Sequence, residues 1–507
     1  MNRNPAILKS LIAYAVCVPL AIWIGYLLTL PMDRTNWSIA GILALLLITP
    51  VLLRWHHFLL VASWNVTMVI FFLPGGPGLW LPMVAISLGI SVLYRALNSK
   101  AHFIPAPQIT LPLLCLGAVV IFTAEMTGGI GLHSLGSEVM GGKRYIFIIM
   151  AILGYFALTA QRIPPERAGW YMLFFLLGGF LAVIGDTARI MPSFLDFIFL
   201  LFPPTGYIYG TEARYGGVAT VGVYGTWLML ALYGVRGIFL SGSLWRLPVF
   251  ALLGVLQFLG GFRSLIIQCA LVFFIQFFLE RMQRTKLLPI FVFAGIFMAV
   301  LVIPFAGKLP YTFQRSLAFL PLNIDPFAKQ DAEASTDWRV RMWKAVLPEV
   351  PGHLLLGKGY AITQSDYDNM VGNFGYISAD NSGSAIAGDY HNGPLSVILP
   401  FGIWGVIAFL WFLIASGRAL QANYRYGDPS LRIVNTFLFA YFITEVIMFF
   451  FVFGLLYTDM AIFVGIVGLS ISLNGGIRRR SDIPVETRDE AGIPATAHPR
   501  LLPFYQP

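Results

Sequence analysis

Long apolar runs recur along almost the whole chain, and most are close to the length that a helix needs to cross a bilayer. About 20 apolar residues span the hydrocarbon core. Only helices and closed barrels satisfy the backbone in lipid, and barrel strands are short alternating segments rather than long apolar runs. The pattern therefore predicts an all-α polytopic membrane protein with about fourteen transmembrane helices. These expected spans lie near 8–30, 38–53, 58–73, 79–96, 108–126, 144–161, 168–185, 217–235, 247–261, 264–280, 287–306, 393–416, 432–454 and 457–474.

The composition excludes other classes of protein. Of 507 residues, 58% are hydrophobic and 11% are charged, whereas soluble domains are about 25% charged. A soluble enzyme and a disordered chain are both excluded. The three cysteines, Cys17, Cys115 and Cys269, lie in apolar runs without the spacing of a zinc site or a disulfide framework. We expect no metal and no other cofactor.

The basic residues predict an orientation. Short cytoplasmic loops carry an excess of Lys and Arg. With the N-terminus in the cytoplasm, 20 of the 33 Lys and Arg residues fall inside, and most of the others fall in long outer loops. Both termini are then cytoplasmic, and the net charge of +9 reflects topology rather than nucleic-acid binding. The span 8–30 is too long for a signal peptide and is expected to be a retained anchor.

The alternation of inner and outer loops divides the chain into five parts. The run 193–203 is too short to span, so we expect it to be re-entrant or interfacial. The outer segment 307–392 is too long for a connector, contains helical patterns such as DWRVRMWKAVLPEV, and is where we expect the chemistry. The expected parts are an N-terminal transmembrane bundle (1–185), a transmembrane segment with the short outer loop (186–306), a large periplasmic loop (307–392), C-terminal transmembrane helices (393–474) and a flexible cytoplasmic tail (475–507).

A histidine motif stands where the large loop meets the next span. His391 and Asn392 are followed, after nine residues, by Gly402 and then Gly405. The motif reads His-Asn-x9-Gly-x2-Gly.

Three arginine elements precede this motif, all on its side of the membrane. Arg214 lies just before the span at 217, and Arg263 follows two glycines and a phenylalanine between two spans. Within the loop, Arg339 and Trp343 form an Arg-x3-Trp element, and further on come Pro351 and the Gly-x-Gly at 357–359.

The order and sidedness of these elements resemble the O-antigen ligase family and its relatives, the Wzy-type polymerases and the O-oligosaccharyltransferases. Their signature begins H[NSQ]x9GxxG, and a Thr commonly follows the second Gly, where this chain has Val406. The resemblance covers roughly 205–475. It implies a GT-C-like architecture at the bacterial inner membrane and a periplasmic active site. The implied partners are an undecaprenyl-diphosphate-linked glycan donor, a lipid A–core or growing-glycan acceptor, and membrane lipids.

Arginine suits the diphosphate leaving group of such a donor. The guanidinium is always charged and bonds phosphate through two N–H groups. It would stabilise the negative charge that grows as the glycosidic C–O bond breaks. The candidates are Arg263, Arg339, Arg341 and Arg214.

The acceptor hydroxyl needs a general base, and His391 is the candidate because its unperturbed pKa is about 6.5. Asp389 is either an alternative base or a group that orients the imidazole. Direct attack would invert the anomeric centre. Asn392 and Glu445 are candidate cavity residues. Glu445 lies within a span, so it needs a partner, either an arginine or a helix–helix hydrogen bond. We expect Trp338 and Trp343 to be packing or interface residues rather than sugar platforms.

Two other functions stay open. A polymerase of the Wzy type uses the same donor, so the catalytic residues do not separate it from a ligase. A transporter or flippase would show repeated halves and ionisable residues near the midplane, whereas this chain has one such residue, Glu445, and no evident repeat.

Overall fold

The computed structural model describes residues 34–73, 75–98, 102–128, 142–204, 207–209, 212–361 and 389–482, together with a few residues between 18 and 26. These ranges are mostly helical, with one short antiparallel hairpin in which Tyr207 lies opposite Arg214. The predicted all-α class of polytopic membrane protein is confirmed.

Nine helices in the described ranges are long and apolar enough to cross a membrane. They are α2 (Arg34–Ser63), α3 (Trp80–Leu97), α4 (Pro107–Thr127), α6 with α7 (Ala168–Leu177, Ala182–Asp186), α9 (Gly216–Phe239), α12 (Leu287–Phe305), α17 (Gly393–Tyr426), α18 (Arg432–Ile447) with its π-helical end (Met448–Val452), and α19 (Leu456–Asn474). Shorter helices of the bundle are α5 (Gly142–Leu158), α10 (Arg246–Leu256) and α11 (Arg263–Leu279).

The predicted count of fourteen spans is not confirmed. The expected spans 38–53 and 58–73 share the single helix α2, which ends at Ser63. The following stretch is rich in β-branched residues and is tied down by non-helical contacts, such as the bond from Val69 N to Leu201 O at 2.7 Å. Most of the expected span 8–30 lies outside the described residues.

Helix α19 is the most enclosed of the nine, and it packs against α5, α17 and α18. Small residues permit this close packing. A Cβ on Gly465 would lie 2.2 Å from the indole nitrogen of Trp64, and one on Gly468 would lie 2.8 Å from Leu158. Trp64 also donates to Ala461 O at 3.1 Å, so α2 is anchored to the centre of the bundle.

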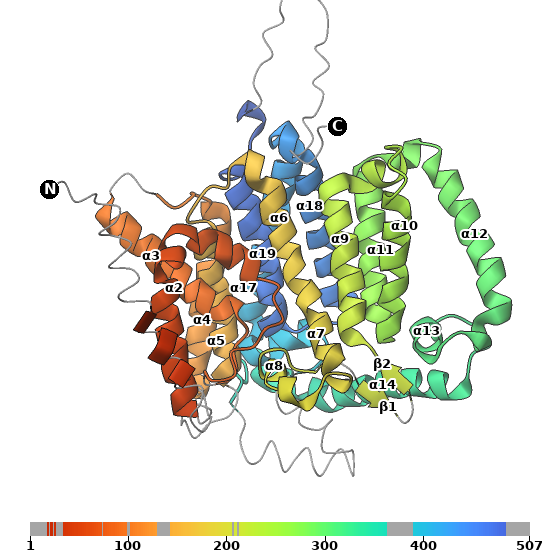
Figure 1. Cartoon of the computed structure of the whole chain (residues 1–507), viewed down its shortest axis with the longest axis horizontal. Coiled ribbons are helices and arrows are strands. Elements are labelled where there is room, and N and C mark those ends of the chain that lie inside the picture. Colours follow the sequence, from red (N-terminus) through yellow and green to blue (C-terminus); the bar gives the residue numbers. More distant parts are fainter. Residues whose placement is uncertain are drawn as a thin grey trace, which may run out of the picture.

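Helix α12 stands apart from the other helices along most of its length (Figure 1), and only 6% of its most apolar window is buried. Phe291, near its start, packs on Phe239, Phe273 and Phe277 of the neighbouring helices. Its other end leads into the elements that cover one end of the bundle.

That end carries α13 (Tyr311–Leu317), α14 (Pro326–Val346), the short helix α8 (Ile198–Leu201) and the hairpin β1–β2 (Tyr207–Tyr209, Glu212–Arg214). Figure 1 shows α14 lying across the lower end of the bundle. Asp325 caps α14 by accepting from Phe327 N at 2.7 Å, and Pro326 occupies its first turn. The helical pattern predicted in the large loop is confirmed here.

Candidate functional site

His391 lies at the junction between the large loop and α17. Its backbone has φ 49°, a conformation that non-glycine residues seldom adopt. The imidazole stacks on Phe453 with a centroid distance of 4.8 Å and meets the edge of Trp338 at 5.3 Å. Its Nδ1 is buried and has no hydrogen-bond partner among the described residues.

Asn392 fixes the position at which α17 begins. Its side-chain oxygen accepts from Leu395 N at 3.0 Å, which makes Asn392 the N-cap of the helix. The histidine is therefore the last residue before a capped helix, and its place relative to the helix axis is set by its neighbour.

The two glycine elements of the sequence motif meet each other. Gly402 breaks the helical conformation of α17 with φ 59°. The segment around Gly357 supplies the missing bonds: Lys358 N donates to Leu399 O at 2.7 Å. A Cβ on Gly357 would lie 2.3 Å from Pro400 O, and one on Gly402 would lie 2.6 Å from Leu354 O. Both positions need glycine because two backbones touch.

Asp389 is held by two groups that sequence reasoning did not single out. Arg144 of α5 forms an ion pair with its carboxylate at 3.1 Å, and the Tyr457 hydroxyl of α19 donates to the same oxygen at 2.8 Å. Arg144 also lies 5.0 Å from the centre of the Tyr457 ring. The carboxylate is thus tied to the N-terminal bundle and does not bond Nδ1 of His391.

Arg339 of α14 lies beside the histidine, and Arg263 of α11 lies close enough to Arg339 for their charges to repel. The Arg339 guanidinium carbon lies 5.7 Å from the centre of the Phe453 ring, and its Nε is buried without a partner among the described residues. Arg263, the first residue of α11, donates to Ala332 O at 2.9 Å and to Thr336 Oγ1 at 3.2 Å on α14. Arg263 therefore joins the bundle to α14, the helix that carries Arg339.

A further arginine, Arg315 of α13, completes this cationic group. It is buried, forms an ion pair with Asp331 at 2.5 Å, and donates to Gly261 O. The Tyr311 hydroxyl donates to Asp331 at 2.7 Å. Burial alone would raise the pKa of Asp331, but the bonds from Tyr311 and Arg315 and the nearby positive charges lower it overall. The Arg214 Nε donates to Gly260 O at 3.0 Å, and its guanidinium lies 4.3 Å from the Phe262 ring centre.

The electrostatics of the site favour a neutral histidine. Burial lowers the pKa of His391, the positive charge of Arg339 lowers it further, and Asp389 opposes both effects. Burial also lowers the pKa of Arg339, with added repulsion from Arg263 and Arg315. The Arg339 charge thus lies beside an imidazole whose pKa is lowered by burial and by that charge.

Two expected site residues lie elsewhere. Arg341 is exposed, and two residues along a helix place it on the opposite face of α14 from Arg339. Glu445 is buried in α18 and accepts from Gln268 of α11. Of the two partners considered for Glu445, the structure has the helix–helix hydrogen bond.

Arg144, Phe453, Arg315 and Asp331 were missed by sequence reasoning. Lys143 and Arg144 form a basic pair at the outer end of an expected span, against the general trend for such loops, and this was the available signal. Phe453 is one of many phenylalanines, and no pattern in the sequence distinguishes it.

The fold and the site define an all-α multi-pass membrane protein with a cationic, histidine-containing site at one end of its helical bundle. Residues 248–410 match the family model described as O-antigen ligase, and this match confirms the resemblance to the O-antigen ligase and polymerase family over that part of the chain. The family implies a membrane glycosyltransferase-like enzyme that acts on lipid-linked glycans and an acceptor. No curated protein matches the chain.

Proposed function

We propose that the chain is an O-antigen ligase-type glycosyltransferase that moves a glycan from undecaprenyl diphosphate to a sugar hydroxyl of lipid A–core. The observation that carries the proposal is that His391 and Arg339 share the Phe453 ring, while Arg263 bonds the helix that carries Arg339 and repels its charge. This is the arrangement that an anionic leaving group and a hydroxyl acceptor together require.

The proposed step is a single displacement. The acceptor oxygen attacks the anomeric carbon of the donor sugar, the bond from that carbon to the diphosphate oxygen breaks, and the configuration inverts. His391 takes the hydroxyl proton, and the bond electrons leave with the diphosphate. General-base catalysis typically contributes about 10²–10⁴-fold, and one preorganised donor to the developing charge about 10²–10³-fold.

Arg339 is suited to the leaving group because its Nε donor is buried and uncommitted among the described residues. A buried donor without a partner costs about 1–3 kcal/mol. A diphosphate oxygen would relieve this cost. Arg315, by contrast, is committed to Asp331 and Gly261, so we assign it to positioning the segment that holds Arg263.

We assign Asp389 a positioning role rather than that of the base. Its carboxylate is already engaged by Arg144 and Tyr457. A carboxylate in an ion pair is a weak proton acceptor. Its negative charge also limits how far the pKa of His391 falls.

The proposal includes an orientation in the bacterial inner membrane. The end that carries α13, α14 and His391 faces the periplasm, where the lipid-linked donor is presented, and both termini are cytoplasmic. The five-part division of the chain given above is part of the same proposal, with 307–392 as the periplasmic loop.

Reconstitution tests this function. Purified protein in liposomes, supplied with an undecaprenyl-diphosphate glycan and lipid A–core, should form the glycan–core product. His391→Ala should abolish product, while His102→Ala, at an exposed site, should not. Near-normal transfer by His391→Ala would refute its role as base. Movement of lipid-linked glycan across the bilayer without transfer would indicate a flippase.

The surface glycans of a deletion strain separate ligase from polymerase. Full-length chains that accumulate on undecaprenyl diphosphate without attachment are the expected result. Single repeat units on lipid A–core would mean that the chain is a polymerase.

A further inference from the structure

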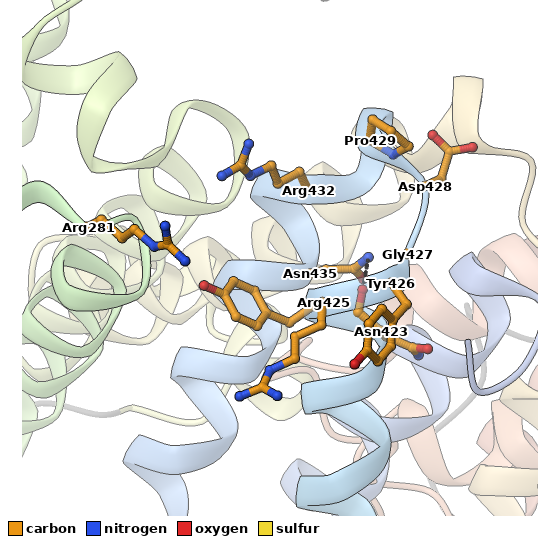
Figure 2. Close-up of a pocket in the computed structure, with 10 residues that line it drawn as sticks. Arg281, Asn423, Arg425, Tyr426, Gly427, Asp428, Pro429, Arg432 and Asn435 are labelled. Atoms are coloured by element: carbon orange, nitrogen blue, oxygen red, sulfur yellow. Dashed lines mark hydrogen bonds between the residues drawn. The ribbon is translucent and has the colours of Figure 1, made fainter. Parts of the chain in front are cut away.

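A cavity of about 580 Å³ lies at the opposite end of the bundle from His391, between the end of α11 and the turn that joins α17 to α18 (Figure 2). Its lining includes Arg281, Arg425 and Arg432. These arginines come from the loop after α11, the last turn of α17 and the first turn of α18. The turn between α17 and α18 thus supplies two positive charges to the cavity, and a segment about 144 positions earlier in the sequence supplies the third.

The nearby acids do not neutralise these charges. Asp428 accepts from Ser430 N at 2.8 Å and from the Ser430 hydroxyl at 2.7 Å. Figure 2 shows Asp428 on the far side of the cavity from the three guanidinium groups. Glu280, next to Arg281, accepts from Val235 N and Arg236 N at 2.9 Å each, so it faces α9. Within the described part of the chain, none of the three arginines forms an ion pair.

The frame around the cavity is fixed by hydrogen bonds. The Tyr424 hydroxyl donates to Leu279 O at 2.9 Å and ties α17 to the end of α11. Asn435 donates to Asn423 O at 3.1 Å and to Asn474 Oδ1 at 3.0 Å, which joins α17, α18 and α19 beneath the cavity. Arg281 has φ 59°, the left-handed conformation. The cavity is therefore a built feature, whereas basic loops that only set topology need no such frame.

We propose that this cavity is a binding site for a phosphate group, most simply the phosphodiester of an anionic phospholipid headgroup. Arginine forks bind phosphate oxygens in pairs. The arginines lie beside the ends of α17 and α18, two of the helices long and apolar enough to cross a membrane, and anionic headgroups attract basic residues at such positions. The site is separate from the proposed glycan transfer and does not depend on it.

The test uses the full chain in detergent, titrated with short-chain phosphatidylglycerol, phosphatidylcholine or inorganic phosphate, with melting temperature and native mass spectrometry as readouts. Phosphatidylglycerol should bind saturably and raise the melting temperature. The triple variant Arg281→Gln, Arg425→Gln, Arg432→Gln should weaken this binding by about tenfold or more. The matched control Arg54→Gln, Arg95→Gln, Arg167→Gln removes the same charge from exposed positions outside the cavity and should change it by less than about twofold.

Equal weakening in the two triple variants would overturn the proposal, since it would show general surface attraction. Absence of saturable binding by both phosphatidylglycerol and inorganic phosphate would also overturn it. An equal response to inorganic phosphate would identify a free phosphate as the ligand, whereas a response to the lipid alone would identify the headgroup. The three arginines are exposed, so the pocket variant should fold. Should it fail to fold, the single variant Arg432→Gln gives the same comparison against Arg54→Gln.

Discussion

His391 and Arg339 pack against the same aromatic ring. The imidazole stacks on Phe453 at 4.8 Å, and the guanidinium carbon of Arg339 lies 5.7 Å from the centre of that ring. Phe453 follows the π-helical end of α18 in an extended conformation. A fixed cation near a half-buried imidazole disfavours its protonation. The residue proposed to hold the leaving group therefore also favours the neutral form of the proposed base.

This coupling predicts a pH effect of Arg339→Gln. Removing the cation makes protonation of His391 easier, so its pKa rises toward 6.5 and the acidic limb of the kcat/KM profile moves to higher pH. The rate at the optimum should fall by about 10²–10³-fold through loss of a leaving-group contact. Arg341→Gln, on the other face of α14, should not change the pH at which the acidic limb of the kcat/KM profile falls. An unchanged limb in Arg339→Gln would contradict the coupling.

Replacement of Arg263 by Lys tests whether a positive charge at this position is enough for the proposed transfer activity. Lysine keeps the positive charge but loses the planar guanidinium, one terminal nitrogen of which bonds both Ala332 O and Thr336 Oγ1. We expect kcat/KM for the lipid-linked donor to fall by about tenfold or more, with a larger loss for Arg263→Gln. Full activity of the lysine variant would show that Arg263 only anchors α11 at the membrane surface.

The sequence was sufficient for the class of fold, because apolar run length predicted most helices. His391, Asn392, Arg263 and Arg339 came from the resemblance of their motifs to a family and stay proposed site residues. The sequence was not sufficient where a contact depends on tertiary packing. Arg144 reaches Asp389 across 245 positions, and the Arg315–Asp331 pair depends on how α13 folds back on α14. Helix α2 continues past an expected turn even though Pro50 lies inside it.

The buried pair between Arg315 and Asp331 predicts that two acidic residues of α14 contribute very differently to the stability of the protein. Asp331→Ala leaves Arg315 buried without its carboxylate, and breaking such a pair costs about 3–5 kcal/mol. Glu333→Ala, two residues away, removes the carboxylate of an exposed pair with Lys329 at 4.0 Å and should change little. Thermal unfolding of both variants in detergent gives the comparison. Similar melting temperatures would mean that Arg315 finds another partner.

Gly402 should not tolerate a side chain. Alanine there needs the unfavourable φ of 59° and places its Cβ 2.6 Å from Leu354 O, so we expect a loss of about 1–3 kcal/mol and a loss of transfer activity. Gly254→Ala, in α10 with open space around it, should be neutral or stabilising by up to about 1 kcal/mol. Wild-type stability in Gly402→Ala would show that the kink is not required.

The ion pair between Arg144 and Asp389 bears on how such enzymes can be divided and recombined. The matched region, 248–410, contains His391 and Asp389 but neither Arg144 nor Phe453. A fragment cut at those limits would carry His391 without the ring it stacks on and Asp389 without its counter-ion. Chimeras that exchange N-terminal bundles between relatives should therefore work only when the incoming bundle presents a cation at the position of Arg144.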